Sequence, residues 1–281
     1  IFIKNYCIIV SCSISEIMKI FIKSFSIFLL ILGSIEVHAQ DPHFSQFHAN
    51  PMYLNPSYTG ANFCPRVIMN YRNQWPALAG DYVTYNTSID FGLNEIHGGL
   101  GLIVLHDRAG WGALNTNKIS LLYAYHAKLS GTTTLSGGFQ FSYFERELDP
   151  NQDFGDEIHP EYGFIFPSFD PFSSPEYMKV TFTDLSLGIL LNTQKYFVGL
   201  ALHHLTEPNY AFEDEENPGP LPMKITVHGG SRIVVEDLGY FNSSFLSKFS
   251  VLTPHILFQK QAESEQINLG ATLSSDKLGL G

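Results

Sequence analysis

Histidines are the residues of this sequence whose grouping could support chemistry. His203 and His204 are adjacent, and His43 and His48 both lie in a proline-bounded segment. Neutral imidazoles are common metal ligands, but adjacent residues of a strand face opposite sides of a sheet, so His203 and His204 are not expected to share a metal. His43 and His48 lack a cysteine or paired carboxylate at the spacing of a zinc site. We therefore predict no metal centre.

Two further motifs are similar to parts of an enzyme and of a calcium site. The string HGGS at residues 228–231 is similar to an esterase oxyanion loop, but it falls in a predicted strand and the sequence has no G-x-S-x-G elbow. The string DPNQDFG at residues 149–155 places Asp, Asn and Asp at alternate positions, as calcium loops do. Its glycine comes one place late, and Pro160 stands where such loops have glutamate. We predict no catalytic residue, no metal and no cofactor.

The net charge and the number of cysteines exclude some classes of function and bear on the compartment. The chain has 16 basic and 27 acidic residues and a net charge of −11. This balance argues against nucleic acid, because proteins hold nucleic acid mainly with Lys and Arg on its phosphates. Of the three cysteines, only Cys64 lies beyond the signal peptide described next, so no internal disulfide is predicted. An exported protein without disulfides is consistent with the bacterial envelope.

Residues 18–39 have the features of a signal peptide: a positive n-region, a short apolar core and a cleavage site of small residues. The apolar core is too short for a transmembrane helix, which needs about 20 apolar residues. We expect export and cleavage to leave Gln40 as the mature N-terminus. Residues 1–17 precede the only plausible start methionine, Met18, so we interpret them as an upstream extension outside the mature protein.

Downstream of residue 62 the sequence alternates apolar and polar residues in segments bounded by Gly, Asn, Asp and Pro, the pattern of strands and turns. Ten segments qualify in full, and an eleventh begins near Ser275. They cover roughly residues 64–74, 80–91, 97–107, 115–129, 132–146, 179–192, 194–205, 222–236, 247–260 and 264–273. No linker or composition shift divides the chain, so we predict one all-β domain over residues 63–281.

The two faces of these strands differ in a way that suits a membrane barrel. In residues 119–128, one face carries large apolar and aromatic residues and the other carries mostly smaller or more polar ones, and residues 135–143 repeat the pattern. Such strands fit a wall between lipid and a polar lumen. A soluble β-sandwich would show similar alternation. Strands of about ten residues, glycines on the presumed inner face and aromatic residues near strand ends favour an antiparallel outer-membrane β-barrel.

Residues 147–178 form a long connection that combines acidic and aromatic residues and has no Lys or Arg. A connection this long inside a compact β domain is usually functional or disordered. Two interpretations remain open: a surface that binds another protein, or a solvated extracellular loop with its own aromatic cluster. The residues expected to make the protein contact are Asp149, Asp153, Asp156, Glu157, Tyr162, Phe164, Phe166, Phe169 and Phe172.

A segment rich in proline and asparagine, residues 40–62, precedes the first strand. Pro42, Pro51 and Pro56 bias the residues before them toward extended geometry and exclude a helix interior, so the Asn-Pro pairs indicate turns. The segment is either a rigid lead-in that packs its aromatic residues against the barrel, or a periplasmic contact surface or plug of the lumen. The residue pattern leaves both interpretations open.

The same segment carries a resemblance to a known family. The stretch QDPHFSQFHANPMYLNPSYTG, residues 40–60, resembles the opening of the PorP/SprF outer-membrane proteins associated with type IX secretion. Later strings at residues 70–76, 82–86, 196–209 and 223–230 are similar to strands and a hairpin of the family. The matching positions of the opening are Gln40, Asp41, Pro42, Phe44, Ser45, Gln46, Phe47, Asn50, Pro51, Leu54, Asn55, Pro56 and Gly60.

The resemblance implies a barrel of about 14 strands, and an even number lets a single-chain barrel close. Ten or eleven strands are visible here, and the chain stops at Gly281 in an apolar run without the aromatic terminus usual for such barrels. We therefore expect C-terminal strands to be missing from this sequence. The barrel over residues 63–281 should then be unclosed, with bare edges.

The resemblance also implies a function. It predicts a non-enzymatic outer-membrane barrel of the type IX secretion system that helps secrete cargo proteins or anchor them at the cell surface. Its partners would be secretion components on the periplasmic side, a secreted cargo or adhesin outside, and outer-membrane lipid. The alternative is an outer-membrane channel or transporter, for which a polar lumen would suffice. A soluble extracellular β-sandwich adhesin domain is a third class.

Overall fold

The computed structural model describes residues 41–62, 64–77, 80–110, 114–149, 157–159, 161, 163–164, 168–169, 178–212, 219–234, 251–274 and 279–280. All of them belong to one unit of the chain, residues 40–281. The upstream extension 1–17, the signal peptide 18–39 and Gln40 lie outside the described residues, so their assignments stay predictions.

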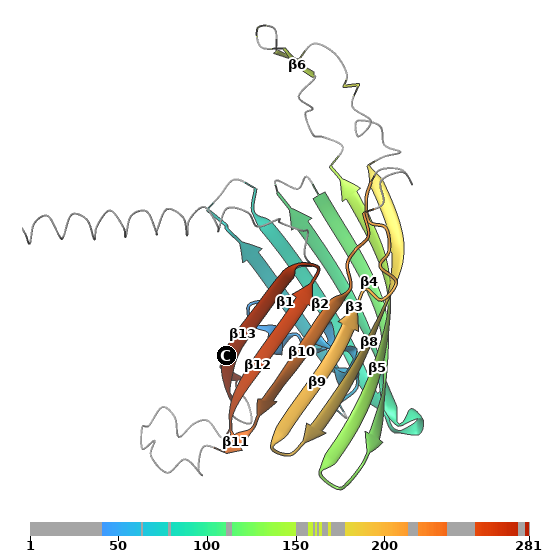
Figure 1. Cartoon of the computed structure of the whole chain (residues 1–281), viewed down its shortest axis with the longest axis vertical. Helices are drawn as coiled ribbons and strands as arrows, with labels where there is room; N and C mark the ends of the chain where they lie inside the picture. The colour runs from blue at the N-terminus through green and yellow to red at the C-terminus, as the bar shows by residue number, and fades with distance from the viewer. Residues whose placement is uncertain are drawn as a thin grey trace, which may run out of the picture. The chain divides into compact units, whose positions relative to one another are not determined.

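One curled antiparallel sheet forms the body of this unit (Figure 1). Its order is β1-β2-β3-β4-β5-β8-β9-β10-β12-β13-β14, so strands that follow one another in the chain also pair in the sheet. The main strands are β1 (Arg66–Gln74), β2 (Tyr82–Leu93), β3 (Gly98–Ala109), β4 (Leu114–Lys128), β5 (Thr133–Leu148), β8 (Lys179–Thr193), β9 (Tyr196–His203), β10 (Lys224–Ser231), β12 (Val251–Gln261), β13 (Ser264–Ser274) and β14 (Gly279–Leu280). The remaining short strands are β11 (Ile233–Val234), which pairs with β12, and the separate pair β6 (Ile158–His159) and β7 (Gly163–Phe164).

The strands predicted from alternation are confirmed. Each of the ten predicted ranges overlaps one of the long strands, and β14 lies in the predicted eleventh range and pairs with Leu273 and Ser274 of β13. Tight turns fix this up-and-down order. Between β2 and β3, for example, the turn η3 (Asn94–Ile96) ends at His97, whose φ of 50° is left-handed and reverses the chain.

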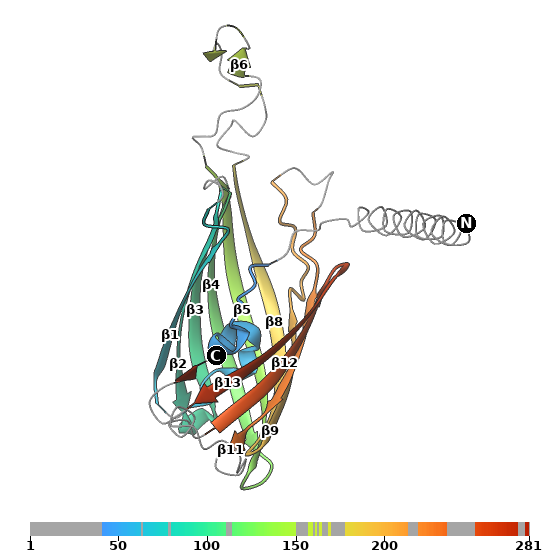
Figure 2. The ribbon, with the colours of Figure 1, turned by 90° about the vertical axis from the view of Figure 1, so that its left-hand side faces the viewer.

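The sheet does not close into a full barrel. β1 pairs with β2 alone and β14 with β13 alone, so no pairing among the described strands joins the two edges. Figures 1 and 2 show the result, a sheet that curls round a lumen while its two edges stay unpaired. The expected unclosed antiparallel barrel with bare edges is confirmed.

The outer and inner faces of the sheet have opposite character, as predicted. On β4, Ile119 and Leu121 are 50% and 61% exposed, whereas Ser120 between them is fully buried. Large apolar side chains face outward on the other strands too, and small polar ones face the lumen, which is the arrangement of a wall between lipid and a polar interior. Outward residues include Met69, Tyr85, Val104, Phe139, Phe141, Tyr143, Ile189, Val198 and Leu269. Inward residues include Thr84, Asn86, Ser88, Gln140, Ser142, Ser186 and Thr226.

Residues 41–60, which we call the lumen segment, lie inside the curve of the sheet (Figure 2). Pro51 and Pro56 each begin a helical turn, where the missing N–H of proline costs nothing. Asn55 before Pro56 is extended, as the sequence indicated, and the turns that follow the prolines are single helical turns. The segment forms three short helices in all. These are η1 (Phe47–Ala49), α2 (Pro51–Leu54) and η2 (Pro56–Tyr58). No helix in the described part of the chain is long and apolar enough to cross a membrane.

Candidate functional site

Glycines on the inner face of the sheet make room for the lumen segment. A Cβ added to Gly138 of β5 would collide with the backbone of Pro56 and Ser57. A Cβ on Gly188 of β8 would meet the side chain of Asn55. Gly137, the neighbour of Gly138 on the same strand, has open space at its Cβ position. The sequence expectation of glycines on the inner face is confirmed, and the structure gives the reason: the backbones approach too closely for a side chain.

Asn55 holds the middle of the lumen segment to the wall. Its side-chain amide donates to the carbonyl oxygens of Ile189 on β8 and Leu200 on β9, each at 3.2 Å. The same Nδ2 lies 3.1 Å from Nε2 of His228 on β10. Its Oδ1 accepts the N–H of Ser57 at 2.9 Å, which caps η2. One fully buried amide thus joins the segment to three strands.

Asp90 of β2 anchors the end of the lumen segment nearest β1. Its carboxylate accepts the N–H of Gly60 at 2.7 Å and receives two hydrogen bonds of 2.9 Å from the guanidinium of Arg66. Arg66 also donates to the carbonyl of Tyr58, at 3.3 Å. Gly60 has φ of 67°, a left-handed conformation that favours glycine. A bidentate pair of this kind is stronger than a neutral hydrogen bond, and it fixes the point where the segment turns into the wall.

Asp41 anchors the other end of the lumen segment. Its Oδ2 lies 2.8 Å from Nε2 of His204 and 2.5 Å from Nζ of Lys224. Nδ1 of His204 lies 2.9 Å from the carboxylate of Asp184 on β8, which also accepts the Thr206 hydroxyl at 3.0 Å. Burial alone would raise the pKa of Asp41, but the charges of His204 and Lys224 hold that pKa well below its usual range.

The adjacent histidines do not face opposite sides of the sheet, so that prediction is wrong. Nε2 of His203 lies 3.2 Å from the carbonyl of Leu54 in the lumen segment, and the ring of His204 lies between Asp41 and Asp184, also inside. The reason is that β9 ends at His203, and His204 takes a left-handed φ of 59° that turns its ring inward. Alternation applies only within a strand.

Aromatic contacts fold the first residues of the lumen segment back onto α2. The hydroxyl of Tyr53 donates to the carbonyl of Pro42 at 2.8 Å, and its ring meets that of Phe44 edge to face at 5.3 Å between centroids. The ammonium groups of Lys118 and Lys224 lie 5.7 and 5.4 Å from the centroid of the same Tyr53 ring. Burial, and then the charge of Asp41, raise the pKa of Tyr53 well above its ordinary value, so it stays a neutral donor.

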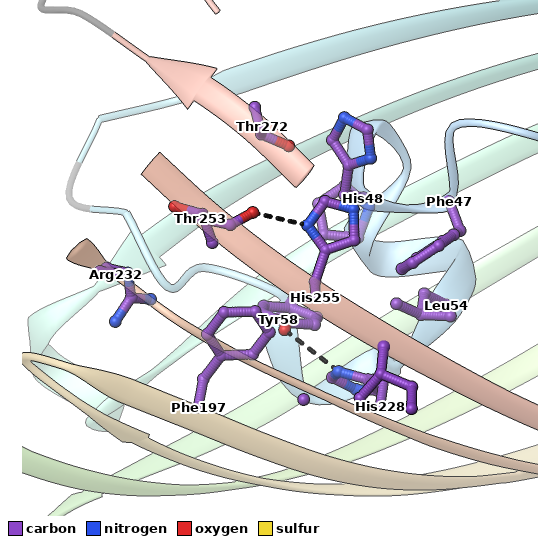
Figure 3. Close-up of a pocket in the computed structure, with 13 residues that line it drawn as sticks. Phe47, His48, Leu54, Tyr58, Phe197, His228, Arg232, Thr253, His255 and Thr272 are labelled. Atoms are coloured by element: carbon purple, nitrogen blue, oxygen red, sulfur yellow. Dashed lines mark hydrogen bonds between the residues drawn. The ribbon is translucent and has the colours of Figure 1, made fainter. Parts of the chain in front are cut away.

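A cavity of about 250 Å³ remains between the lumen segment and the wall formed by β9, β10, β12 and β13 (Figure 3). Its lining includes six aromatic side chains. The rings of His48 and His255 lie 4.7 Å apart, and the hydroxyl of Tyr58 lies 3.5 Å from Nδ1 of His228. The guanidinium of Arg232 lies 5.3 Å from the Phe197 ring. Burial and the neighbouring His255 lower the pKa of His48 below its ordinary value.

Comparison with known proteins assigns the chain. The model of a family described as type IX secretion system membrane protein PorP/SprF matches residues 36–281. The chain belongs to the PorP/SprF family. Comparisons with curated proteins and with solved structures gave no match. The family is one of outer-membrane β-barrels, in agreement with the apolar outer face and curled antiparallel sheet described above.

Most of the residues that carried the PorP/SprF resemblance line the contact between the lumen segment and the sheet. Asp41, Asn55 and Gly60 make the polar contacts described above, and Phe47 packs with Leu54 and Leu257. Ser45 and Gln46 are exposed, and Gln40 lies outside the described residues. The motif residues buried in the lumen are Phe47, Asn50, Leu54, Asn55, Pro56 and Gly60.

The expected protein-contact loop of this PorP/SprF protein is described only in part. Phe169 is 89% exposed, Asp149 and Glu157 are described, and the backbone of Phe164 belongs to β7. The other expected contact residues lie outside the described residues, as does most of the calcium-like string. Those residues are Asp153, Asp156, Tyr162, Phe166 and Phe172.

Sequence reasoning missed the wall residues that hold the lumen segment. Asp90, Lys118, Asp184 and Lys224 belong to strands, and each is nearly fully buried. A signal was present: each charged residue falls on the face of its strand that carries Ser, Thr and other polar residues. Charges on the lumen face of a barrel strand need partners within the lumen. Here the partners of Asp90 and Lys224 come from the lumen segment or the residues beside it.

Proposed function

We propose that this PorP/SprF protein is a non-enzymatic barrel that helps particular cargo proteins cross the outer membrane or stay attached to the cell surface. The observation that carries the proposal is the lumen segment. It is fixed to the inner face at Asp41, Asn55 and Gly60, so the protein's own chain occupies part of the space that a diffusion channel would use. An occupied lumen leaves the rim and loops as surfaces for partners, which supports protein docking.

The ends of the barrel suggest where partners bind. Because neighbouring strands are antiparallel, the long connections 149–178 and 204–223 and the turn 262–263 fall at one end. The turns 94–97, 129–132 and 194–195 and the connection from β11 to β12 fall at the other, so most of the short turns lie at this second end. In outer-membrane barrels the short turns face the periplasm and the longer loops face outside. Cargo or adhesin would then contact the long-loop end, and secretion components would contact the short-turn end. The apolar outer face would meet outer-membrane lipid.

Deletion of the gene tests the role in secretion. We expect cargo proteins to be lost from the surface of intact cells, measured by surface labelling and mass spectrometry, and to return when the gene is restored. Restoration with Phe169→Ser should recover less surface cargo, because this exposed side chain lies in the long acidic loop. Trp75→Ser, an exposed aromatic at the same end but outside the acidic loop, is the matched control. Cargo that stays in place after deletion would count against the proposal.

Channel activity is the second candidate, because the inner face is polar. Planar bilayers distinguish the two functions. A steady large conductance from the purified wild-type protein would support a channel, and silence would support docking. A soluble adhesin domain would stay in the aqueous phase without detergent, whereas a membrane barrel would fractionate with the outer membrane and shift its gel mobility on boiling.

A further inference from the structure

A single carboxylate of the lumen segment is surrounded by cations of the wall. Asp41 faces Lys224 and His204 at 2.5 and 2.8 Å, and Lys118 adds a third positive charge nearby. These groups come from β10, the end of β9, and β4. We propose that they form a carboxylate-binding site inside the barrel, which Asp41 fills and which thereby latches the lumen segment in place. The proposal concerns the isolated barrel and does not depend on the role in cargo secretion.

The wall holds the site in its binding geometry. Both ring nitrogens of His204 face carboxylate oxygens, Nε2 toward Asp41 and Nδ1 toward Asp184. Ionised carboxylates only accept hydrogen bonds, so both nitrogens donate and the ring is an imidazolium. Asp184 is itself oriented by the Thr206 hydroxyl. The wall therefore presents an oriented cation to any carboxylate in the position of Asp41.

Because Lys224 and His204 are buried, their pairing with Asp41 has a large effect on stability. The side chains of Lys224 and His204 are 4% and 1% exposed. A buried pair that loses one partner is strongly destabilised, because the remaining charge cannot be solvated. Asp184 balances one cation, and Asp107 and Arg72 are further charged groups whose fields reach this region. Without Asp41, Lys224 has no carboxylate partner among the ion pairs of the described residues.

Chemical rescue tests the site. Asp41→Gly removes a CH₂COO⁻ group, and acetate has that size and charge, whereas acetamide has the size without the charge. Docking is read from the rate at which a maleimide reacts with a cysteine placed at Ser57, in a Cys64→Ser background. Ser57 belongs to the segment and is fully buried against β5 and β8, so a cysteine there reacts only when this part of the segment leaves the wall. The sample is the full chain in detergent, with Cys7 and Cys12 also replaced by serine.

We expect Asp41→Gly to raise the reaction rate by about a hundredfold or more, the size of effect that loss of one partner of a buried ion pair produces. Acetate should restore at least about a tenth of the protection, and acetamide or chloride at the same concentration should not. Equal rates for Asp41→Gly and wild type, or equal effects of acetate and acetamide, would overturn the proposal. Asp81→Gly, at the more exposed pair with Arg108, is the matched control.

A double variant keeps the test decisive if Asp41→Gly fails to fold. Lys224→Met removes the cation and retains much of the side-chain volume. If charge pairing is the cause, Asp41→Gly with Lys224→Met should fold and protect Ser57→Cys better than Asp41→Gly alone, because fewer buried charges lack partners. If the two changes add without coupling, the carboxylate site is excluded. Cargo takes no part in these measurements, and Asn55 and Gly60 also fix the segment, so failure of the carboxylate site can be told apart from failure of the proposed function.

Discussion

The backbone of Gly138 on β5 lies directly against the backbone of Ser57 in the lumen segment, with no room for a methyl group between them. The wall and the segment are therefore fitted to each other at the level of the main chain. A cluster of Met52, Ile103 and Leu122 adds apolar packing from β3 and β4. The lumen segment is thus part of the folded barrel interior.

Gly138→Ala should loosen the lumen segment. The new Cβ would collide with Pro56 and Ser57, and overpacking of this kind costs about 1–3 kcal/mol. The labelling rate of Ser57→Cys in a Cys64→Ser background should rise accordingly. Gly137→Ala is the matched control, because the same change one residue away points into open space. Equal labelling rates for the two variants would contradict the close contact between Gly138 and the lumen segment.

Asn55→Asp should also release the segment. The two carbonyl oxygens of Ile189 and Leu200 now accept from the Asn55 amide, and a carboxylate would place an acceptor and a buried charge against them. We expect a loss of about 3 kcal/mol in docking. The temperature at which the folded gel band disappears measures the effect. Asn268→Asp is the control, because the Oδ1 of Asn268 accepts from Gln266 and the substitution keeps that acceptor. A similar melting shift for both would count against the role of Asn55.

The strands of this barrel were predictable from the sequence because the direction of each side chain depends only on its position within its own strand. Alternation within each strand decides which side chains face outward, so Ile119 and Ser120 could be placed on opposite faces from their order alone. Gly, Asn, Asp and Pro marked the turns, which also depend on the local sequence. The sequence showed ten or eleven strands and an unclosed barrel was expected from that number, in agreement with the unpaired edges of β1 and β14.

The lumen contacts were not predictable because they join residues far apart in the sequence. Asp41 meets His204 and Lys224 only after the sheet has curled. His203 and His204 were wrongly expected on opposite faces because alternation does not say where β9 ends. Pro51 and Pro56 excluded a helix interior but not a helix start. The sequence therefore set residues 40–62 apart as a segment distinct from the strands, but it did not predict which residues of the wall they contact.

Protonation of His48 should weaken docking of the lumen segment as the pH falls. Burial and the neighbouring His255 lower the pKa of His48, so the undocked form takes up a proton at a higher pH than the docked form. The contribution of His48 is therefore full above the ordinary histidine pKa of about 6.5 and is lost as the pH falls from there to the lowered value. The pKa of His43 is lowered in the same direction, by burial and Lys224.

Gel melting temperatures between pH 8 and pH 5 measure this dependence. His48→Gln should reduce the slope, because it removes one of the titrating groups. Asp41 should not contribute in this range. Its pKa lies well below the ordinary value, so its stabilisation is full above about pH 4 and is lost only in stronger acid. His204 contributes with the opposite sign, because, against the effect of burial, Asp41 and Asp184 raise its pKa. An unchanged slope in His48→Gln would therefore contradict the assignment to His48.

Cys64 is a native probe of the orientation of the barrel. It is exposed, and it lies just before β1 at the end of the sheet that carries the turns 94–97 and 129–132. If those turns face the periplasm, a membrane-impermeant maleimide should label Cys64 only after the outer membrane is permeabilised. Ala77→Cys in a Cys64→Ser background is the counterpart. Its site is exposed and follows β1 at the opposite end, so it should react in intact cells. The reverse pattern would mean that the long connections 149–178 and 204–223 face the periplasm, and cargo docking on them outside the cell would be ruled out.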